Sequence, residues 1–307
     1  MDRIRLSIIM TCHNRKACTC GCIGQLIKAA DFYPVDCSFF VCDDGSTDGT
    51  ADVIRDIPGV HIIKGTGDLF WARGMAAAMT EAEKHEADFY LMVNDDVVFY
   101  DHALRVMFDS FYAVPGGMHA VVGSTVDART GERTYGGHWW NGKALRKEIC
   151  TPVLPQSPCG ECNQANWNCF LIPKALYDAI GRIDTYYEHG WADYDYSNRI
   201  VAAGYKIYVA SDYIGTCSAN SIEGTWRDTS LPLWTRLKAK EKKTGVPARS
   251  YWYYCRKYYG KYALPMFLAT YASIVKTSIL KKTGRCPFSR YDVGMKQEES
   301  TKHEGCT

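Results

Sequence analysis

Short apolar runs alternate with helix-like segments in the N-terminal third of the chain. Four of these runs have the length and composition of β-strands, and they cover residues 5–11, 38–42, 61–64 and 89–93. The segments between them that are rich in helix formers are residues 47–57 and 71–87. This alternation is typical of βαβ units, so we predict an α/β fold with a central, mainly parallel sheet flanked by helices.

The alternation continues less regularly through the middle of the chain. A helix is expected over 101–114 and a strand over 120–126, and the Gly- and Trp-rich residues 131–142 predict a hairpin and a loop over a cleft. Beyond this segment we predict a strand, two helices and a further strand, over residues 165–172, 173–181, 192–204 and 205–211.

The composition changes after residue 225. Lys, Arg, Tyr and Trp become frequent, and residues 226–307 are predicted to form a C-terminal helical extension. Its apolar stretch 263–275 is followed at once by Lys276 and is expected to be too short to cross a bilayer. This stretch either lies on a membrane surface or packs on the main domain, and the sequence favours neither.

The overall composition excludes several classes of protein. With 47% hydrophobic and 23% charged residues among 307, the chain has enough apolar content for a large core. Its 36 Lys and Arg nearly balance 34 Asp and Glu, so charge gives no reason to expect a nucleic-acid partner. The start MDRIRLSIIMTC lacks a signal-peptide cleavage site, which predicts a cytoplasmic protein whose 14 cysteines stay reduced.

Polar residues follow each of the four predicted N-terminal strands. Ligands of an open parallel sheet bind beyond the carboxyl ends of its strands. The residues at these ends include Thr11, His13, Asn14, Arg15, Asp43, Asp44, Gly67, Asp68, Asn94, Asp95 and Asp96. Carboxylates gathered at one rim repel one another unless a cation offsets their charge. We therefore predict a divalent metal, Mn²⁺ or Mg²⁺, which binds carboxylate and substrate phosphate oxygens together.

Each acidic pair also has a simpler interpretation. Asp43 and Asp44 would serve in a plain turn that caps the next helix, and Asp95 and Asp96 would cap the helix near residue 101. Four consecutive strand ends are seldom all polar by chance, which favours a binding site. No GxGxxG follows the first strand and no GxxxxGK[ST] occurs, so dehydrogenase and P-loop functions lose their main support.

The side-chain chemistry suggests individual roles at this rim. Asp43 is suited to accept a hydrogen bond from an NH group of a pyrimidine base. Arg73 is suited to contact a base or a phosphate. Phosphate charge would otherwise be met by the metal or by Arg15, because the usual phosphate-binding loops are missing.

The sequence resembles the family 2 glycosyltransferases of the GT-A fold, particularly bacterial surface-polysaccharide enzymes. The matching segments, in consistent order, are IIMTCHNR, VCDDGSTDGT, GDLFWARGM, LMVNDDV and GRIDTYYEHGWADYDYSNRIVAAGYKIY. Each segment alone is weak, but the combination is specific and covers about residues 5–220. The resemblance implies a GT-A catalytic domain over 1–225, with a donor half of about 1–100 and an acceptor half of about 101–225.

The resemblance also implies roles for residues of the donor half. Asp43 would read the base, and Asp68 and Arg73 would support the nucleotide. Asp96 would bind the metal, with Asp95 near the ribose or the sugar. Together with the residues at the strand ends, these side chains form the predicted donor site.

In the acceptor half the resemblance assigns Asp193, within WADYDYSNR, as the general base. An inverting transfer needs a carboxylate that takes the proton of the attacking hydroxyl, while the metal and arginines stabilise the departing diphosphate. We predict that Trp191 contacts the acceptor sugar, with Trp71, Trp139, Trp140 and Trp167 as further candidates for stacking on sugar rings and core packing as the more common role of a Trp. Asp195 is predicted to orient the acceptor side, with a structural cap or ion pair as the alternative.

Two positions differ from the family pattern. Ala192 stands where a Glu often precedes the base, and YIGTCSAN, with Cys217, stands where a metal-binding His is common. A thiolate is a poor ligand for Mg²⁺. Either Asp96 and the phosphates hold the metal alone, or the dependence on metal is weaker than the family pattern implies.

These observations predict an inverting, metal-assisted glycosyltransferase that is either free in the cytoplasm or peripheral on the inner face of the membrane. It would move a sugar from a UDP- or dTDP-sugar to a hydroxyl of a polysaccharide or lipid-linked acceptor. One alternative is a sugar-nucleotide nucleotidyltransferase, which ordinarily has a Gly-rich loop with Arg and Lys that CHNRKACTCG lacks. The other is a non-catalytic carbohydrate-binding protein.

Overall fold

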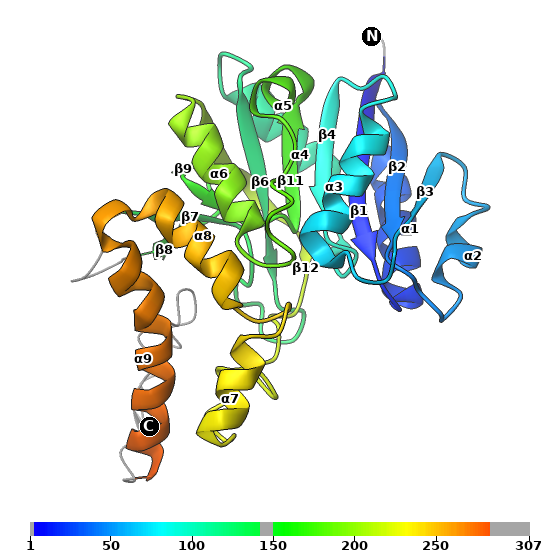
Figure 1. Cartoon of the computed structure of the whole chain (residues 1–307). Helices are drawn as coiled ribbons and strands as arrows, with labels where there is room; N and C mark the ends of the chain where they lie inside the picture. Colours follow the sequence, from blue (N-terminus) through cyan, green and yellow to red (C-terminus); the bar gives the residue numbers. More distant parts are fainter. Residues whose placement is uncertain (1–2, 142–149, 283–307) are drawn as a thin grey trace, which may run out of the picture.

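A large mixed sheet forms the centre of the molecule (Figure 1). The computed structural model describes residues 3–141 and 150–282. In spatial order the strands are β3 (Val60–Lys64), β2 (Val35–Asp43), β1 (Ile4–Cys12), β4 (Phe89–Val93), β11 (Cys169–Pro173), β6 (His119–Val126), β12 (Lys206–Thr216) and β5 (Val98–Phe99). A short strand that pairs with β12 completes this sheet, β9 (Glu161–Cys162). A second, smaller sheet has the order β10 (Gln164–Ala165), β7 (Gly137–Trp140) and β8 (Cys150–Pro152).

Helices cover both faces of the large sheet. In chain order the helices of the described residues, including those of the extension that lie away from the sheet, are α1 (Lys16–Ala30), α2 (Thr50–Ile54), α3 (Phe70–Ala82), α4 (Ala103–Ala113), α5 (Lys174–Ile180), α6 (Ala192–Ala202), α7 (Leu233–Lys240), α8 (Ala248–Tyr258) and α9 (Ala263–Lys282). The described residues thus form the α/β arrangement that the sequence predicted, with helices on the sheet and a helical C-terminal extension.

The direction of the first four strands places their carboxyl ends at one edge. Strands β1, β2, β3 and β4 run parallel, whereas β11 runs antiparallel to both of its neighbours, β4 and β6. The register aligns Cys12 with Asp43, and Asp43 with Lys64. The polar residues that follow these strands therefore meet at the same rim of the sheet.

Two apolar cores lie on opposite faces of the sheet. Since side chains alternate along a strand, Ile8 and Ile9 of β1 belong to different cores. Helices α3, α5 and α6 contribute to the core with Ile9, and α1 and α4 to the core with Ile8. Helix α3 packs closely on β1 because residue 74 is glycine: a Cβ there would lie 2.3 Å from Thr11 Oγ1.

Some elements have bounds that differ from the prediction. The helix expected over 47–57 is limited to Thr50–Ile54, because Gly49 before it has a left-handed backbone (φ 80°). The strand expected over 165–172 is divided into β10 and β11, and the residues between them face a cavity. The last predicted strand continues beyond residue 211 to Thr216, with two register shifts against β6.

The segment predicted as a hairpin forms part of the smaller sheet. Strand β7 pairs with both β8 and β10 in antiparallel fashion. The predicted loop reaches residue 142, and residues 142–149 lie outside those that the structure describes.

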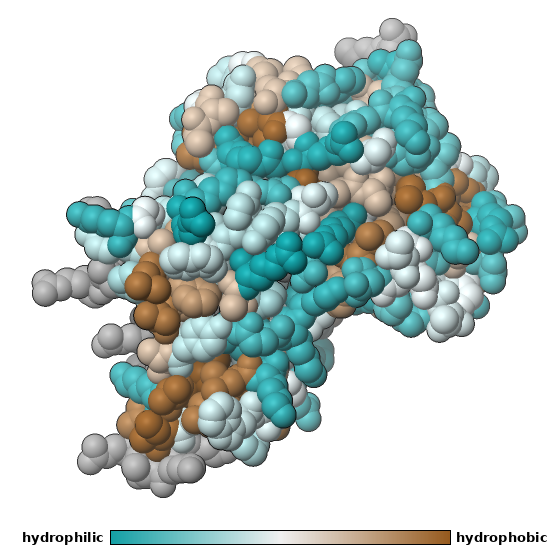
Figure 2. All heavy atoms as spheres, in the orientation of Figure 1, coloured by the Kyte–Doolittle hydropathy of each residue, from teal (hydrophilic) through white to brown (hydrophobic). Residues whose placement is uncertain are grey.

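The C-terminal extension is divided between the main core and a small core of its own. Tyr254 of α8 belongs to the core that contains Ile9 and side chains of α3 and α6. Tyr251 and Cys255 of α8 instead pack with Ala263 and Met266 of α9. In Figure 1, α8 lies beside α6 while α9 projects away from the sheet, and Figure 2 shows hydrophobic side chains over the region of α9. The predicted extension continues to residue 307, and its part from 283 onwards is outside the described structure.

The expectation that the apolar stretch 263–275 is too short to cross a bilayer is wrong on length. A 3-10 turn (Gly260–Tyr262) precedes it, and α9 continues past Lys276. The segment Gly260–Leu280 has 21 residues and a mean hydropathy of 1.4, which is long and apolar enough to span a membrane by these two criteria alone.

Candidate active site

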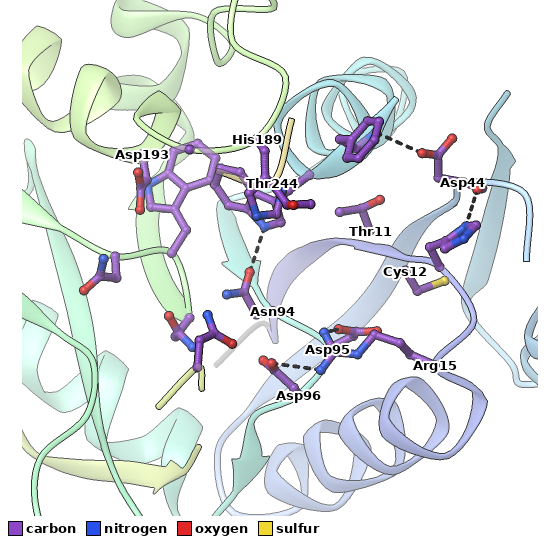
Figure 3. A pocket seen from close by; sticks show the side chains of 18 of the residues that line it. Thr11, Cys12, Arg15, Asp44, Asn94, Asp95, Asp96, His189, Asp193 and Thr244 are labelled. Carbon is purple, nitrogen blue, oxygen red and sulfur yellow. Dashed lines mark hydrogen bonds and ion pairs between the residues drawn. The ribbon is translucent and has the colours of Figure 1, made fainter. Parts of the chain in front are cut away.

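A cavity of about 600 Å³ opens at the carboxyl ends of β1, β2 and β4 (Figure 3). It is lined by nine of the predicted site residues: Thr11, His13, Arg15, Asp44, Gly67, Asn94, Asp95, Asp96 and Asp193. Six others do not line it: Asn14, Asp43, Asp68, Arg73, Trp191 and Asp195. The cavity therefore joins residues from the first 96 positions with Asp193, which the fold brings in from α6.

Asp44 organises the loop on one side of this cavity. Its carboxylate accepts hydrogen bonds from the backbone amides of Gly67, Leu69 and Phe70, at 2.8, 2.9 and 2.9 Å. Gly45 is needed for this close approach, because it has a φ of 76° and a Cβ there would lie 3.0 Å from the Cα of Gly67. The carboxylate of Asp44 thus holds the loop after β3 against the end of β2.

Asp43 takes part in the turn that was the simpler interpretation of this pair. Its Oδ1 accepts a hydrogen bond from the backbone amide of Ser46 at 2.8 Å, and its side chain is buried beside the cavity rather than in its lining. Neighbouring residues at a strand end point to opposite sides, so only one member of the pair faces the cavity.

His13 and Asn14 tie the end of β1 to the end of β2. The Nδ1 atom of His13 lies 2.6 Å from the carbonyl oxygen of Asp44. Asn14 has a left-handed backbone (φ 51°), and its Oδ1 accepts a hydrogen bond from the amide of Thr47 at 2.7 Å. Asn14 therefore supports the rim from outside the cavity.

Arg15 links the two aspartates that follow β4. Its guanidinium lies 3.1 Å from Asp95 Oδ1 and 2.9 Å from Asp96 Oδ2. Asp95 is buried, and its Oδ2 accepts a hydrogen bond from the hydroxyl of Thr19 at 2.9 Å. Burial raises the pKa of Asp95 to about 6, although Arg15 and Thr19 oppose the shift. The alternative that this pair caps the next helix is wrong, since α4 has His102 as its N-cap and no side-chain cap.

The residues around Asp96 fit a hard divalent cation only when the substrate supplies further oxygens. Asp96 keeps 27% of its side chain exposed to the cavity, and no group of three acidic, His or Cys side chains that would hold a metal occurs among the described residues. Burial and the nearby Asp96 raise the pKa of Cys217 to about 12, and the thiol donates to Asp96 Oδ1 at 3.7 Å. Cys217 thus supports the carboxylate as a neutral thiol, and incomplete protein coordination is usual for Mg²⁺ and Mn²⁺ bound with phosphates.

Asp193 occupies a different side of the cavity from Asp95 and Asp96 (Figure 3). It lies in the first turn of α6, and its Oδ1 accepts a hydrogen bond from the amide of Tyr194 at 2.9 Å. Within the described part of the chain no Lys or Arg pairs with it. Burial raises the pKa of Asp193 to about 6, while hydrogen bonds from Tyr194 and Asn166 limit the shift.

Asp195, two residues further on, has a different environment. Its side chain is 0% exposed, and Lys257 Nζ lies 2.6 Å away while Arg199 Nε lies 3.1 Å away. The hydroxyls of Tyr258 and Tyr187 also donate to it, at 2.7 and 3.1 Å. This carboxylate joins α6 to α8, which matches the ion-pair alternative for Asp195 and leaves it no direct access to an acceptor.

Trp191 also serves the junction with α8. Its ring packs on Tyr251 and Tyr254, with ring centroids 4.8 Å apart in each pair. Its left-handed backbone (φ 77°) forms the N-cap of α6 and sets the direction of the turn that carries Asp193. Trp191 therefore supports the turn of the predicted base through its packing on α8, and it does not line the cavity.

Arg73 and Asp68 point to other partners. Arg73 donates to the carbonyl of Thr185 at 3.1 Å and lies 3.4 Å from Glu188, beside a second, more open hollow. Lys243 of the extension lies 2.6 Å from Asp68 and 3.6 Å from Glu188. These contacts connect the donor half, the loop before α6 and the extension.

Several residues that line the cavity were not predicted from the sequence. They are Cys12, Phe70, Tyr135, Asn166, Asn168, His189, Gly190, Asn220 and Thr244. His189 lies within the matched segment GRIDTYYEHGWADYDYSNR, four residues before Asp193, and this proximity was the one available signal. Thr244 comes from the extension, where no motif pointed to it.

Trp71 and Trp167, which the sequence offered only as stacking candidates, both line the cavity. The indole nitrogen of Trp71 donates to Asn94 Oδ1 at 2.8 Å, and the two rings meet edge to face with centroids 5.8 Å apart. Trp167 Nε1 and His189 Nδ1 are buried and have no hydrogen-bond partner among the residues that the structure describes. Burial also lowers the pKa of His189, so its imidazole is neutral near pH 7.

Residues 7–165 match the family described as glycosyl transferase family 2, and the chain belongs to this family. It is therefore a glycosyltransferase, as the sequence segments predicted. No curated protein matches the sequence significantly.

Three solved structures are similar to at least two thirds of this chain. A mannosyltransferase from Pyrobaculum calidifontis, PcManGT in complex with GDP-Man and Mn²⁺, has a TM-score of 0.53 at 17% identity, over 92% of this chain and 79% of that one. GalNAc-T7 with UDP, GalNAc and Mn²⁺ has a TM-score of 0.51 at 13% identity, over 68% of this chain and 42% of that one. TarS of S. aureus has a TM-score of 0.50 at 15% identity, over 72% of this chain and 37% of that one. At these identities the likeness shows the fold, which is the predicted GT-A fold.

Proposed function

We propose that this glycosyltransferase moves a sugar from a nucleotide diphosphate donor to an acceptor hydroxyl with inversion at the anomeric carbon. The observation that carries the proposal is the shared cavity of Asp96 and Asp193, on different sides of the space that both line. The family match ends at residue 165, so the position of Asp193 is independent of it. An inverting transfer needs this separation, because the base and the leaving diphosphate act on opposite faces of the sugar.

The donor half is proposed to bind the nucleotide and its diphosphate. Arg15 and the backbone around His13 lie at the rim. Asp43 does not line the cavity, and only the family resemblance supports it as the contact to the base of a UDP- or dTDP-sugar. Mn²⁺ or Mg²⁺, held by Asp96 with the diphosphate oxygens, would act as a Lewis acid that stabilises the leaving diphosphate. The solved structures of PcManGT and GalNAc-T7, which contain Mn²⁺, support this assignment.

The contacts of Arg73 and Asp68 change the roles that we propose for them. Both side chains are engaged by the loop before α6 or by Lys243 rather than directed into the cavity. We therefore assign them to positioning: Arg73 holds the loop that carries His189, and Asp68 anchors the extension next to Thr244. Neither is proposed to touch the phosphates.

Asp193 is proposed to accept the proton of the acceptor hydroxyl. As the hydroxyl oxygen bonds to the anomeric carbon, the bond from that carbon to the phosphate oxygen breaks, and the electron pair leaves with the diphosphate. A pKa of about 6 keeps Asp193 mostly ionised near neutral pH while making it a stronger base than an ordinary aspartate. Trp191 and Asp195 position the turn that carries it, through their contacts with α8.

The acceptor is proposed to be a saccharide or a lipid-linked saccharide in polysaccharide or glycolipid biosynthesis. Trp71 supports a sugar ligand, since aromatic rings pack on the apolar faces of sugar rings, whereas Trp167 is 1% exposed and packs in the core beside it. The cytoplasmic location stays a prediction from the sequence. Seven of the twelve described cysteines are buried, as expected of side chains that serve as small core hydrophobes.

A thermal-shift screen of nucleotide sugars, with and without Mn²⁺, tests the donor assignment. A ligand that binds only the folded protein raises its Tm, so one nucleotide sugar should raise it, and more strongly when Mn²⁺ is present. NMR of the product should show that the transferred sugar has the anomeric configuration opposite to the one it had in the donor. Pyrophosphate released from a nucleoside triphosphate and a sugar phosphate would instead favour a nucleotidyltransferase. Sugar binding that EDTA does not affect, without turnover, would favour a carbohydrate-binding protein.

A further inference from the structure

Helix α9 carries an apolar stripe that faces solvent over most of its length. The stripe consists of Leu264, Leu268, Ala272, Val275 and Ile279, which follow one another at intervals of three or four residues. The exposed fractions of the four larger side chains are 55%, 50%, 38% and 55% in chain order. An exposed helix face of a soluble protein is normally polar, so this stripe indicates a surface that another apolar phase covers.

We propose that this stripe docks on an anionic membrane surface, with α9 lying in the plane of the interface. The consequence for catalysis rests on the proposed function: a lipid-linked acceptor would reach the cavity from the bilayer on which α9 lies. The contact itself depends only on the extension.

The opposite face of α9 explains why the helix lies on the bilayer rather than crossing it. Its side chains at Met266, Thr270 and Ile274 are buried, and the helix packs on α7 and α8. Arg236 of α7 is 3% exposed and donates from Nη1 to Thr277 Oγ1 at 3.0 Å and to Ile274 O at 3.2 Å. Insertion across a bilayer would strip α9 from this buried guanidinium, which is unfavourable without replacement partners.

Charge identifies the kind of surface. Residues 226–282 contain 13 Lys and Arg but only two Asp and Glu, whereas residues 1–225 contain 19 and 28. Lys276 is exposed on α9, and Lys261 is exposed in the 3-10 turn directly before it. Anionic lipid headgroups attract such a basic segment, and the exposed apolar stripe beside the charges can enter the interface. A second copy of this chain would present the same excess of positive charge, so self-association through α9 would be opposed by repulsion.

The docking face is joined firmly to the active site. Thr244, between α7 and α8, lines the cavity, and Lys257 of α8 pairs with Asp195 of α6 at 2.6 Å. A membrane bound at α9 would therefore hold the cavity at a fixed orientation to the bilayer, and no moving part is required.

Co-sedimentation of the full chain with vesicles tests the proposal. One set of vesicles contains phosphatidylcholine alone, and the other contains phosphatidylcholine with phosphatidylglycerol. The wild-type protein should bind the anionic vesicles at least tenfold more tightly than the neutral ones, and added salt should weaken this binding. The Leu268→Ser/Val275→Ser variant should bind the anionic vesicles at least tenfold more weakly than the wild type, because both positions lose their apolar contact with the lipid.

A matched control uses two exposed valines outside the extension. Val53 and Val201 are each 42% exposed, and their double replacement by Ser should leave vesicle binding unchanged. Equal binding by the Leu268→Ser/Val275→Ser variant and the wild type would overturn the proposal. It would also be overturned if the wild type resists extraction by high salt and alkaline carbonate, which marks a spanning helix, or forms a dimer that the stripe variant abolishes.

Donor binding, measured in the same preparations by thermal shift, separates the two proposals. The stripe variant should keep the Tm increase that the nucleotide sugar gives the wild type. If the wild type binds anionic vesicles but no nucleotide sugar raises its Tm, the proposed function fails and the membrane contact stands. If donor binding is normal but vesicles are not bound, only the membrane contact fails.

Discussion

The two sides of the cavity are held in place in different ways. At the donor rim, Asp44, His13 and Asn14 bond mostly to the backbone of neighbouring strand ends and loops. On the side of Asp193, the supports come from α8, which follows it by more than fifty positions and contacts Trp191 and Asp195. The donor rim is therefore supported locally, whereas the base side needs the C-terminal extension. The comparison teaches that the extension supports the turn of the proposed base as well as offering a surface for other contacts.

The same contrast exists within one helical turn. Asp193 and Asp195 are two residues apart in α6, which places them on opposite sides of a helix with 3.6 residues per turn. Asp193 faces the cavity without a cationic partner among the described residues, and Asp195 is buried between Lys257 and Arg199. One carboxylate is thus available for chemistry and the other holds two helices together, so their replacement should have separate consequences.

The largest effect is expected from Asp193→Asn. The amide keeps the shape of the side chain but cannot accept the hydroxyl proton, so kcat should fall about a thousandfold, within the range typical of general bases. The affinity for the nucleotide sugar and the Tm should change little, because Asp193 has no ion pair to lose in the described structure. Steady-state kinetics and donor titration measure the two quantities.

Asp109→Asn is a suitable control for this variant, since Asp109 lies on α4 and is not part of the cavity lining. It should keep both kcat and donor affinity. Turnover by Asp193→Asn within a few-fold of the wild type, with donor binding intact, would remove Asp193 from its role as base.

Asp195→Asn should act mainly on stability. The change leaves Lys257 and Arg199 beside a neutral amide in a buried place, and breaking such a pair lowers the free energy of unfolding by about 3 kcal/mol. For a chain of this size that corresponds to a Tm decrease of roughly 5 to 10 °C. Differential scanning calorimetry measures the change, and the folded fraction should still bind donor.

The exposed pair of Lys174 and Asp178 provides the comparison for this experiment. Its two side chains are 46% and 53% exposed, so solvent screens the ion pair and Asp178→Asn should leave the Tm nearly unchanged. Equal Tm values for Asp195→Asn and Asp178→Asn would mean that Asp195 does not join α6 to α8 in solution.

Much of the donor side was predictable because it follows local rules. Buried parallel strands are continuous apolar runs, so β1 to β4 were recognised, and their polar ends had to meet at one rim. It was harder to predict which member of an acidic pair faces the cavity. In the first pair Asp44 rather than Asp43 lines it. In α6 the periodicity of the helix does separate Asp193 from Asp195.

The remaining residues of the site depend on contacts that no local pattern describes. His189 and Asn166 lie in loops whose paths are set by the packing of α6 and the smaller sheet. Thr244 lines the cavity because the extension docks on the main domain, through Lys243 with Asp68 and Lys257 with Asp195. Arg73 was placed in the donor site by its position in a motif, but its partners are Thr185 and Glu188, far along the chain.

Asp96→Asn tests the donor rim and is expected to have a smaller effect than either change in α6. The amide is a weaker ligand for a hard cation, so the affinity for the nucleotide sugar in the presence of Mn²⁺ should fall about 10- to 100-fold. The affinity in EDTA should hardly change. Isothermal titration with and without Mn²⁺ gives both values.

Asp101→Asn is the matched control, because Asp101 is close in sequence and pairs with Lys28 at the surface. Its donor affinity should equal that of the wild type under both conditions. An Asp96→Asn variant that binds donor as tightly as the wild type in Mn²⁺ would show that Asp96 does not hold the metal.

The smallest effect is expected from pH, and it separates the two sides of the cavity once more. Burial raises the pKa of both Asp193 and Asp95 to about 6, well above that of an ordinary aspartic acid. Asp193 acts as a base only when ionised, so kcat should rise about tenfold per pH unit below pH 6 and level off above it. Protonation of Asp95 weakens its pairing with Arg15, so donor affinity should also fall below pH 6.

The two titrations are distinguished by what each variant removes. In Asp193→Asn the residual kcat should lose its dependence on pH, while the affinity for the nucleotide sugar in Mn²⁺ should keep its decrease below pH 6. In Asp95→Asn the dependence of affinity should disappear and that of kcat should remain, since the two carboxylates lie on different sides of the cavity. If one variant abolished both dependences, the two sides would titrate as a coupled unit, and the separation between a locally supported donor rim and an extension-supported base would be wrong.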